Sequence, residues 1–572
     1  MEHFNPQAVR LTKYLFFTGK GGVGKTSAAC ATAVSLADNG KKVLLVSTDP
    51  ASNLQDVFGI ELTNKNTAIK EVPNLVVANL DPMQSAAEYR ESVLSPYRGK
   101  LPEAVLNNME EQLSGSCTVE IAAFNEFSHF ITDEDVQEEY DHIIFDTAPT
   151  GHTLRMLQLP SAWSNFISEN THGASCLGQL SGLESKKQVY KGAVETLSDG
   201  ELTTLVLVSR PEEAPLKEAA RASLELADIG VNNQAFIING MLADYDDAVS
   251  KSFFEKQQNA LDAMPEELKG LKTYQIPFRA YNVTGIENVR ALLTSDDYVL
   301  QDEKVRAQTI LQLQDVIDDL YKSKKKVIFT MGKGGVGKTS VAAAIALGLS
   351  AKGAKVHLAT TDPAGNANFA IGESSGIGMS RIDEEAELRK YQEEVLSKAR
   401  ETMSEDDIAY IEEDLRSPCT QEIAVFRAFT QIVEKAESET VVIDTAPTGH
   451  TLLLLDSTQS YHKEVQRTQG GEIPEAVKKL LPRLRNTDET EVIIVTLAEA
   501  TPVYEAKRLE EDLQRAGINA KWWIINASLY RTDTNNRMLA AKASNEIEWI
   551  NKVDEHTDGK FAVIGWRAED AE

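Results

Sequence analysis

Short apolar runs alternate along the chain with helix-length segments, and this pattern occurs twice. In the first half the runs cover residues 14–18, 43–48, 75–80, 142–146, 204–209, 235–239 and 274–277. In the second half they cover residues 327–331, 356–361, 441–444, 492–496, 522–526 and 561–565. Short buried strands separated by helices are typical of a mostly parallel sheet flanked by helices. The repeat therefore predicts two tandem α/β domains arranged as a pseudo-two-fold pair.

The same pattern predicts where the two domains divide. Residues 1–281 form the first domain and residues 327–572 the second. Residues 282–326 are polar and mainly helical in character, and nothing like them follows the second domain. We therefore interpret them as the connecting segment. The shared motifs fall outside the regions that differ in length, as expected if insertions lie in loops.

The sequence GKGGVGKT follows the first apolar run of each half, at residues 19–26 and 332–339, and an Ala-rich helical segment follows it. A glycine-rich loop between a strand and a helix binds phosphate through its N–H groups and the helix N-terminus. A glycine-rich turn without nucleotide is the alternative, but two identical copies argue against it. The predicted nucleotide-binding residues are Gly19, Gly21, Gly22, Val23, Gly24, Lys25, Thr26, Ser27, Gly332, Gly334, Gly335, Val336, Gly337, Lys338, Thr339 and Ser340.

Two residues of each loop have further predicted roles. Lys25 and Lys338 supply a full positive charge beside the phosphates, so we count them among the catalytic residues. Thr26 and Thr339 place a hydroxyl where a phosphate-bound Mg²⁺ would lie.

An aspartate follows the second apolar run of each half, in STDPASN and TTDPAGN. A carboxylate at the end of a strand beside the phosphate loop can orient the attacking water. Asp49 and Asp362 are therefore candidate catalytic residues. The alternative is a turn-forming aspartate before proline.

A second acidic motif, DTAPTGHT, is identical at residues 146–153 and 444–451. An aspartate at the end of an apolar strand is suited to holding Mg²⁺ beside a phosphate loop. Asp146 and Asp444 are the predicted Mg²⁺ ligands. The Pro-Thr-Gly-His continuation predicts a loop that changes shape when the γ-phosphate leaves.

Three of the four cysteines lie where a soft ion could reach them. Cys117 and Cys419 occur at matching positions, in SCTVEIAAF and PCTQEIAVF, just before amphipathic helices that favour the thiolate. Cys176 lies in a Gly/Ser-rich loop of the first half and has no counterpart. Three thiolates together could bind a soft ion. Cys30, in an Ala-rich helix, fits a small buried residue better.

Composition limits the classes of partner. The 572 residues include 58 basic and 87 acidic side chains, for a formal charge of −29, which disfavours nucleic acid and anionic lipid surfaces. No apolar run approaches the ~20 residues that span a bilayer, and the N-terminal residues do not resemble a signal peptide. Four cysteines indicate a reducing compartment. We therefore expect a cytoplasmic protein without a nucleic-acid partner or direct membrane insertion.

Each GKGGVGKT copy carries a second lysine, Lys20 or Lys333, which a general phosphate loop does not require. This form, together with DTAPTGHT and the tandem halves, resembles the ArsA and guided-entry family of ATPases over nearly the whole chain. In that family the extra lysine crosses a two-fold interface to the partner's nucleotide. The resemblance implies that Lys20 and Lys333 each serve the ATP bound in the other half, within a chain that is a pseudo-dimeric monomer.

The ArsA branch implies a metalloid-stimulated ATPase that uses Mg²⁺ and drives arsenite or antimonite extrusion. As(III) or Sb(III) would be ligand and activator, and the partners would be an ArsB-like membrane pump subunit and an arsenic metallochaperone. Carried over by position, His152, His450 and Ser417 join the three cysteines at the metalloid site. Asn239 and Asn526 match residues that contact adenine. The histidines could instead make orienting hydrogen bonds, and the asparagines could be turn residues.

The guided-entry branch gives the alternative function, an ATP-dependent targeting factor for tail-anchored membrane proteins. The relative with that function is a homodimer joined by zinc at a Cys-x-x-Cys pair, and this sequence contains no such pair. Its ten methionines are scattered rather than gathered in a client-binding helix. A partition ATPase that binds DNA or membrane fits the acidic charge poorly. The metalloid-driven ATPase is therefore the favoured interpretation.

Overall fold

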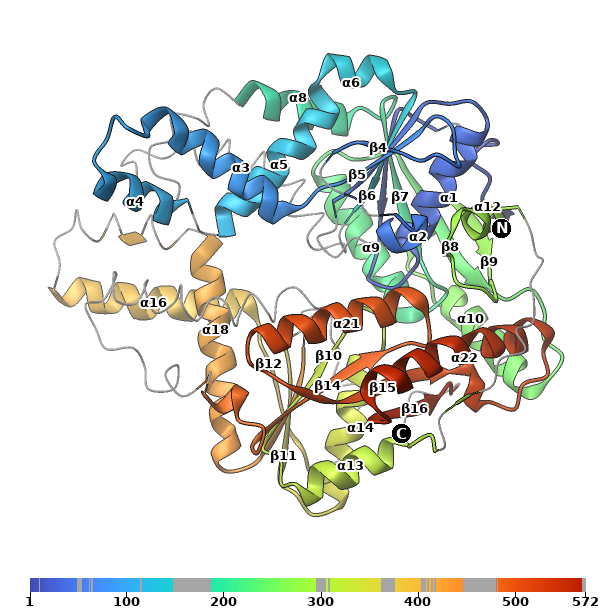
Figure 1. Ribbon diagram of the computed structural model, residues 1–572, viewed down its shortest axis with the longest axis vertical. Coiled ribbons are helices and arrows are strands. Elements are labelled where there is room, and N and C mark those ends of the chain that lie inside the picture. Colours follow the sequence, from blue (N-terminus) through green and yellow to red (C-terminus); the bar gives the residue numbers. More distant parts are fainter. Residues whose placement is uncertain are drawn as a thin grey trace.

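The computed structural model describes residues 1–9, 11–48, 54–60, 62, 65–113, 116–147, 187–294, 305–306, 309–361, 376–402, 408, 411–412, 415, 418–445, 480 and 482–567. Two α/β halves face each other across the molecule, with the first half in blue to green and the second in yellow to red (Figure 1). Each half has its own sheet, with helices against both faces.

The sheet of the first half is parallel except at one edge. Its strands, in spatial order, are β1 (Glu2–His3), β9 (Lys272–Pro277), β8 (Gln234–Met241), β7 (Thr203–Ser209), β2 (Tyr14–Thr18), β6 (His142–Asp146), β3 (Val43–Ser47), β5 (Leu75–Asn79) and β4 (Thr67–Ala68). Among the described strands of this sheet, β4 alone runs antiparallel to its neighbour. Along β2, Tyr14 and Phe16 enter one core and Leu15 and Phe17 the other. Because both faces are covered, such strands read as continuous apolar runs.

The sheet of the second half is parallel throughout. Its spatial order is β12 (Gly378–Arg381), β11 (Val356–Thr360), β13 (Thr440–Asp444), β10 (Val327–Met331), β14 (Thr490–Thr496), β15 (Ala520–Ser528) and β16 (Phe561–Gly565). Strand β10 lies between β13 and β14, just as β2 lies between β6 and β7. The two halves therefore share one topology, which confirms the predicted pair of mostly parallel α/β domains.

Helices surround both sheets. In the first half they are α1 (Lys25–Asp38), α2 (Leu54–Phe58), α3 (Pro82–Leu94), α4 (Glu103–Gln112), α5 (Ser116–Thr132), α6 (Glu134–Glu139), α8 (Lys187–Ser198), α9 (Glu213–Asp228), α10 (Ala248–Asp262), α11 (Glu266–Lys269) and α12 (Ile286–Ala291). In the second half they are α13 (Leu313–Lys322), α14 (Lys338–Ala351), α16 (Glu384–Thr402), α18 (Pro418–Glu434), α21 (Ala500–Arg515) and α22 (Arg537–Thr557). Single 3-10 turns are η1 (Ser95–Tyr97), η4 (Lys435–Glu437) and η5 (Leu529–Arg531).

Three edge strands, β1, β4 and β12, were not predicted. Each is only two to four residues long and lacks a buried apolar run, so hydrophobic pattern gives no signal for it. Within the predicted connecting segment, α12 packs on α1 and α13 packs on α14. The division at residues 281 and 327 stays a prediction.

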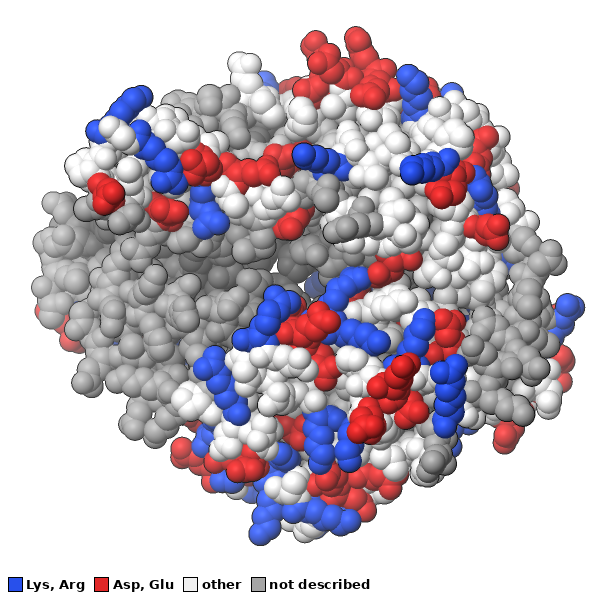
Figure 2. Space-filling view, in the orientation of Figure 1, with Lys and Arg blue, Asp and Glu red and all other residues white. Residues whose placement is uncertain are grey.

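The described surface is mixed in charge. On the face shown in Figure 2, acidic and basic side chains are interspersed over both halves rather than gathered into a basic surface. Within the described ranges, none of the helices combines the length and the apolar character needed to cross a bilayer.

The halves are joined at the starts of two matching helices. Asp247 caps α10, and Asn536 caps α22. The Asp247 carboxylate also crosses to the second half, where it accepts hydrogen bonds from the Thr534 hydroxyl (2.7 Å) and from the backbone N–H groups of Asn535 (2.6 Å) and Asn536 (3.0 Å). One side chain thus holds a helix start in each half.

An apolar cluster lies beside this junction and also draws on both halves. Leu242 and Phe278 come from the first half, whereas Leu529 and Leu539 come from the second. The ring of Trp566 lies 5.1 Å from that of Phe253, measured between centroids. Burial of apolar surface between the halves therefore accompanies the polar contacts of Asp247.

Replacing Asp247 with Ala should weaken the junction. Burial by itself raises the pKa of Asp247, but hydrogen bonds from Ser250, Thr534 and Asn535 outweigh it and hold the pKa well below its ordinary value. A carboxylate with a lowered pKa stabilises the fold above its unfolded pKa, and this contribution is lost as the pH falls through the folded pKa. We expect the variant to lose about 2 kcal/mol of unfolding free energy at pH 7, and less below pH ~4.

Urea unfolding at pH 7 and at lower pH measures this effect. The matched control is Asp244→Ala, because Asp244 is exposed in the same loop. The control should keep the wild-type midpoint. Equal midpoints for the two variants would contradict the role given to Asp247.

Candidate active site

The two predicted phosphate-binding loops contact each other through their backbones. A Cβ atom added to Gly22 would lie 2.8 Å from the carbonyl oxygen of Gly334, and one added to Gly335 would lie 2.6 Å from that of Gly21. Gly22 and Gly335 also have positive φ angles, 82° and 84°, which favour glycine. The contact is reciprocal, as a pseudo-two-fold axis requires. The predicted nucleotide loops therefore meet at the interface between the halves.

Each loop leads directly into the N-terminus of a helix. Helix α1 begins at Lys25 after Gly24, which is left-handed (φ 91°, ψ 27°), and α14 begins at Lys338 after Gly337 (φ 87°, ψ 30°). The first N–H groups of each helix therefore face the loop, where they favour an anion. Lys25 and Lys338 are each only 6% exposed. A buried lysine beside the first N–H groups of a helix suits a polyphosphate.

A threonine and an aspartate are paired next to each loop. The Thr26 hydroxyl donates to Asp146 Oδ2 (2.8 Å), and the Thr339 hydroxyl donates to Asp444 Oδ2 (2.7 Å). Both aspartates end the strand beside the loop strand and are 1% exposed. A hydroxyl and a buried carboxylate are hard oxygen donors, so these residues fit the predicted Mg²⁺ site. Mg²⁺ binding itself stays a prediction.

The asparagines expected near adenine have a structural contact as well. Asn239 Nδ2 donates to the Val23 carbonyl (2.9 Å), and Asn526 Nδ2 donates to the Val336 carbonyl (3.0 Å). Each amide thus fixes the loop one residue before the glycine that starts the helix. Sequence alone left turn formation and base contact open, and it did not suggest this anchoring role. Contact with adenine stays a prediction.

The second lysine of each loop lies at the same interface. Lys333 directly precedes Gly334, which contacts the first-half loop. Its Nζ atom forms an ion pair with Glu505 Oε1 of its own half at 2.5 Å. Its backbone carbonyl accepts a hydrogen bond from Lys338 Nζ (3.2 Å). That Lys20 and Lys333 each contact the nucleotide bound in the opposite half stays a prediction.

The helices that carry two of the candidate metalloid ligands meet across the interface. Cys117 is the second residue of α5, and Cys419 is the second residue of α18. The two helices contact each other, and Figure 1 shows their N-terminal ends approaching. The side chains of both cysteines lie outside what the structure describes. So do these predicted site residues: Asp49, His152, Cys176, Asp362, Ser417 and His450.

Cys30 differs from these cysteines. It is fully buried in α1, which confirms the prediction of a small core residue. Burial raises the pKa of its thiol, and the nearby Asp146 carboxylate raises it further. Cys30 is therefore held as a thiol, which is a poor ligand for a soft ion.

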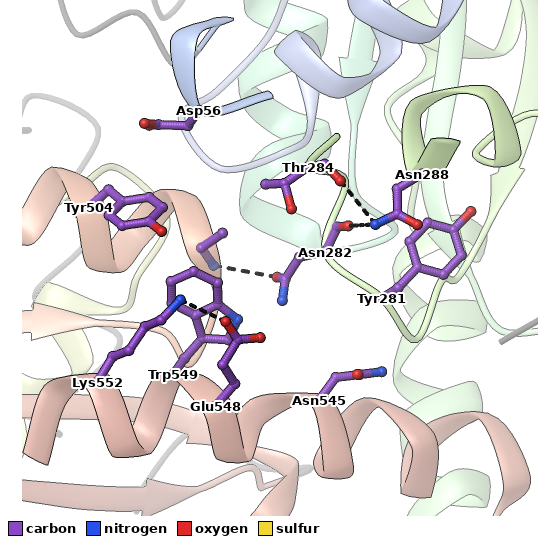
Figure 3. Close-up of a pocket in the computed structure, with 11 residues that line it drawn as sticks. Asp56, Tyr281, Asn282, Thr284, Asn288, Tyr504, Asn545, Glu548, Trp549 and Lys552 are labelled. Carbon is purple, nitrogen blue, oxygen red and sulfur yellow. Dashed lines mark hydrogen bonds and ion pairs between the residues drawn. The ribbon is translucent and has the colours of Figure 1, made fainter. Parts of the chain in front are cut away.

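A cavity of about 330 Å³ lies between the halves and was not predicted (Figure 3). Residues after β9 and on α2 line it from the first half, and residues of α21 and α22 line it from the second. Asn282 Oδ1 accepts from the Ala500 N–H across it (3.4 Å), while Lys552 Nζ lies 3.8 Å above the Trp549 ring. Its lining comes from separate segments that share no motif, so the sequence carries no signal for it.

Comparison with known proteins places these features in a family. The family model for anion-transporting ATPases matches residues 12–295, 325–470 and 471–564. The chain is 46% identical over 558 residues to an arsenical pump-driving ATPase of Acidiphilium multivorum, covering 96% of this chain and 95% of that protein. It is 45% identical over 563 residues to one of Escherichia coli, with the same coverage. An ATPase GET3 of Komagataella phaffii is 32% identical over 304 residues, which is 49% of this chain.

Removing an asparagine anchor should weaken nucleotide binding. In Asn526→Ala the Val336 carbonyl loses its donor, and the loop next to Gly337 is no longer fixed. We expect the Kd for ATP at that loop to rise about 5- to 10-fold, equivalent to the ~1 kcal/mol of one hydrogen bond. Asn239→Ala should have the same effect on the first loop.

Titration with a fluorescent ATP analogue measures the change. Asn232→Ala is the control, because Asn232 is exposed and bonds only to a nearby turn carbonyl among the contacts of the described residues. Wild-type affinity in both anchor variants would show that the two amides do not support the loops.

Proposed function

Because the chain belongs to the anion-transporting ATPase family and is thus an ATP-hydrolysing enzyme, we propose that As(III) or Sb(III) stimulates its ATP hydrolysis. We further propose that this hydrolysis powers arsenite or antimonite extrusion. The observation that carries the proposal is the interface itself. Two complete phosphate-binding loops meet there, and so do the helices that bear Cys117 and Cys419. One movement between the halves can therefore act on both kinds of site.

In each nucleotide site the loop N–H groups and the helix N-terminus bind the phosphates, and Lys25 or Lys338 neutralises charge on them. Thr26 with Asp146, and Thr339 with Asp444, would hold Mg²⁺. When bound, Mg²⁺ offsets the negative charge on the phosphate oxygens.

The remaining nucleotide-site residues act on the reacting groups. Asp49 and Asp362 would orient water for in-line attack on the γ-phosphate. Lys20 and Lys333 would each reach the nucleotide of the opposite half. Lys333 directly precedes Gly334, which contacts Gly21 of the first loop, and this position in the chain supports the role.

The metalloid would bind Cys117, Cys176 and Cys419 as thiolates, with His152, His450 and Ser417 nearby. Because Cys117 and Cys419 belong to different halves, a metalloid that bridges them binds the closed interface more tightly than the open one. Such differential affinity raises the population of the closed, hydrolytic form. Asp146 and His152 lie six positions apart on one segment, as do Asp444 and His450. Each segment would link a Mg²⁺ site to the metalloid site.

The relatives named arsenical pump-driving ATPase support a membrane pump subunit, ArsB-like, as the partner that uses the cycle. A metallochaperone would deliver the metalloid. We propose that the chain acts in the cytoplasm and associates with the membrane through the pump.

Replacing the cysteines tests the proposal. We expect Cys117→Ser, Cys176→Ser and Cys419→Ser to lose the stimulation of ATP hydrolysis by arsenite or antimonite, or to need at least about tenfold more metalloid, because a hydroxyl is a poor ligand for a soft ion. The measurement is the ratio of stimulated to basal hydrolysis over a metalloid titration.

Cys30→Ala is the matched control and should keep the wild-type ratio, since Cys30 is buried in α1. Unchanged stimulation in all three serine variants would remove the sulfur site from the proposal. An ATPase indifferent to metalloid that co-purifies with a transmembrane peptide would instead support the targeting function.

A further inference from the structure

The ion pair between Lys333 and Glu505 links the second loop to a helix of its own half. The pair is short, 2.5 Å between Nζ and Oε1, and both side chains are largely buried, at 18% and 7% exposure. Glu505 projects from α21, which follows β14 beside the loop strand β10. A direct, poorly hydrated ion pair of this kind strongly restrains a lysine.

The first half has the matching glutamate but not the matching pair. Glu218 on α9 corresponds to Glu505, because each lies three residues after a proline in the first turns of equivalent helices. Glu218 pairs with Arg221, one turn along its own helix, at 2.7 Å. No ion pair joins Glu218 to Lys20 among the residues that the structure describes. The two loops are thus identical in sequence, but their second lysines are held differently.

The cause is an aspartate that only one half possesses. Arg221 corresponds to Arg508, which turns away from Glu505 and pairs across the interface with Asp56 on α2 at 2.8 Å. Counted from the aspartates of the STDP and TTDP motifs, the second half has Phe369 in place of Asp56. Because Arg508 pairs with Asp56, it does not pair with Glu505, and the Glu505 carboxylate pairs with Lys333 instead.

A second carboxylate near Lys333 is already engaged. Glu499 directly precedes α21 and pairs with Lys542 at 2.8 Å. Burial by itself raises the pKa of Glu499, but Lys542 and the first-half Arg210 outweigh it and lower the pKa to about 2. Glu499 thus stays ionised and paired, and Glu505 is the carboxylate in direct contact with Lys333.

We infer that Glu505 is a positioning residue that holds Lys333 in its own half and competes with the polyphosphate of ATP in the first loop. The inference rests on the proposed crossing of Lys333 to that nucleotide. For Lys333 to cross, its Nζ atom must leave Glu505, and part of the binding energy of ATP is spent on this separation. Among the described contacts, Glu218 pairs with Arg221 rather than with Lys20. The two nucleotide sites therefore differ, with the first site weakened by Glu505.

Steady-state ATP hydrolysis by the full chain, without metalloid, tests this inference. The substitution Asp444→Asn removes the Mg²⁺-side carboxylate of the second site and isolates the first, whereas Asp146→Asn isolates the second. In the Asp444→Asn background we expect Glu505→Gln to lower the KM for ATP about 3- to 10-fold, with less change in kcat. In the Asp146→Asn background it should leave KM within about twofold. An unchanged or raised KM in the first background would overturn the inference.

Two further glutamate variants make the test specific. Glu218→Gln is the matched control and should not lower KM in either background. Glu505→Asp keeps the charge at shorter reach, so its KM should lie between those of wild type and Glu505→Gln. An equal decrease with Glu218→Gln would also count against the inference, and thermal unfolding midpoints check that each variant is folded.

Lys333→Ala separates this inference from the proposed function. If it leaves first-site hydrolysis unchanged, Lys333 does not reach the opposite nucleotide. The proposed crossing and the inferred restraint by Glu505 then both fail. If it abolishes first-site hydrolysis while Glu505→Gln has no effect on KM, the crossing stands and the restraint by Glu505 is wrong.

Discussion

Backbone contact between Gly21 and Gly22 of one phosphate loop and Gly334 and Gly335 of the other is the constraint on which the arrangement depends. No side chain fits between them, so the two helix N-termini, with their excess of N–H donors, are brought to one interface. Two such positive ends are unfavourable neighbours unless anions lie near them. The contact therefore places both predicted nucleotide loops at the interface between the halves.

Within this symmetric frame the surroundings of the loops are unequal. Asp56 draws Arg508 across the interface, and Glu505 consequently holds Lys333. In a homodimer every interface residue appears twice, so such one-sided pairs cannot arise. Tandem fusion removes that restriction, because Asp56 could appear without a partner at position 369.

Much of the fold could be predicted from the sequence because its strands are buried on both faces and read as apolar runs, as β2 and β10 do. The strand-loop-helix context singled out Thr26, Thr339, Asp146 and Asp444 separately as residues beside Mg²⁺. The structure brings each hydroxyl into contact with a carboxylate, as Thr26 with Asp146 and Thr339 with Asp444. Edge strands such as β12 were missed because they bury little. The Lys333–Glu505 pair was missed because 172 positions separate its partners and no motif joins them.

If the proposed metalloid site forms, its connection to the nucleotide sites can be traced along the chain. Helix α5 leads through α6 to β6, which ends at Asp146, and α18 leads to β13, which ends at Asp444. Each cysteine-bearing helix is thus followed in the chain by the strand that places a buried carboxylate beside a phosphate loop. A ligand that draws α5 and α18 together must move these strands or the interface between them, because packed cores shift as units rather than deform. Coupling would then need only a small rigid displacement of one half relative to the other. Because the two loops touch through their backbones, such a displacement would change their contact directly.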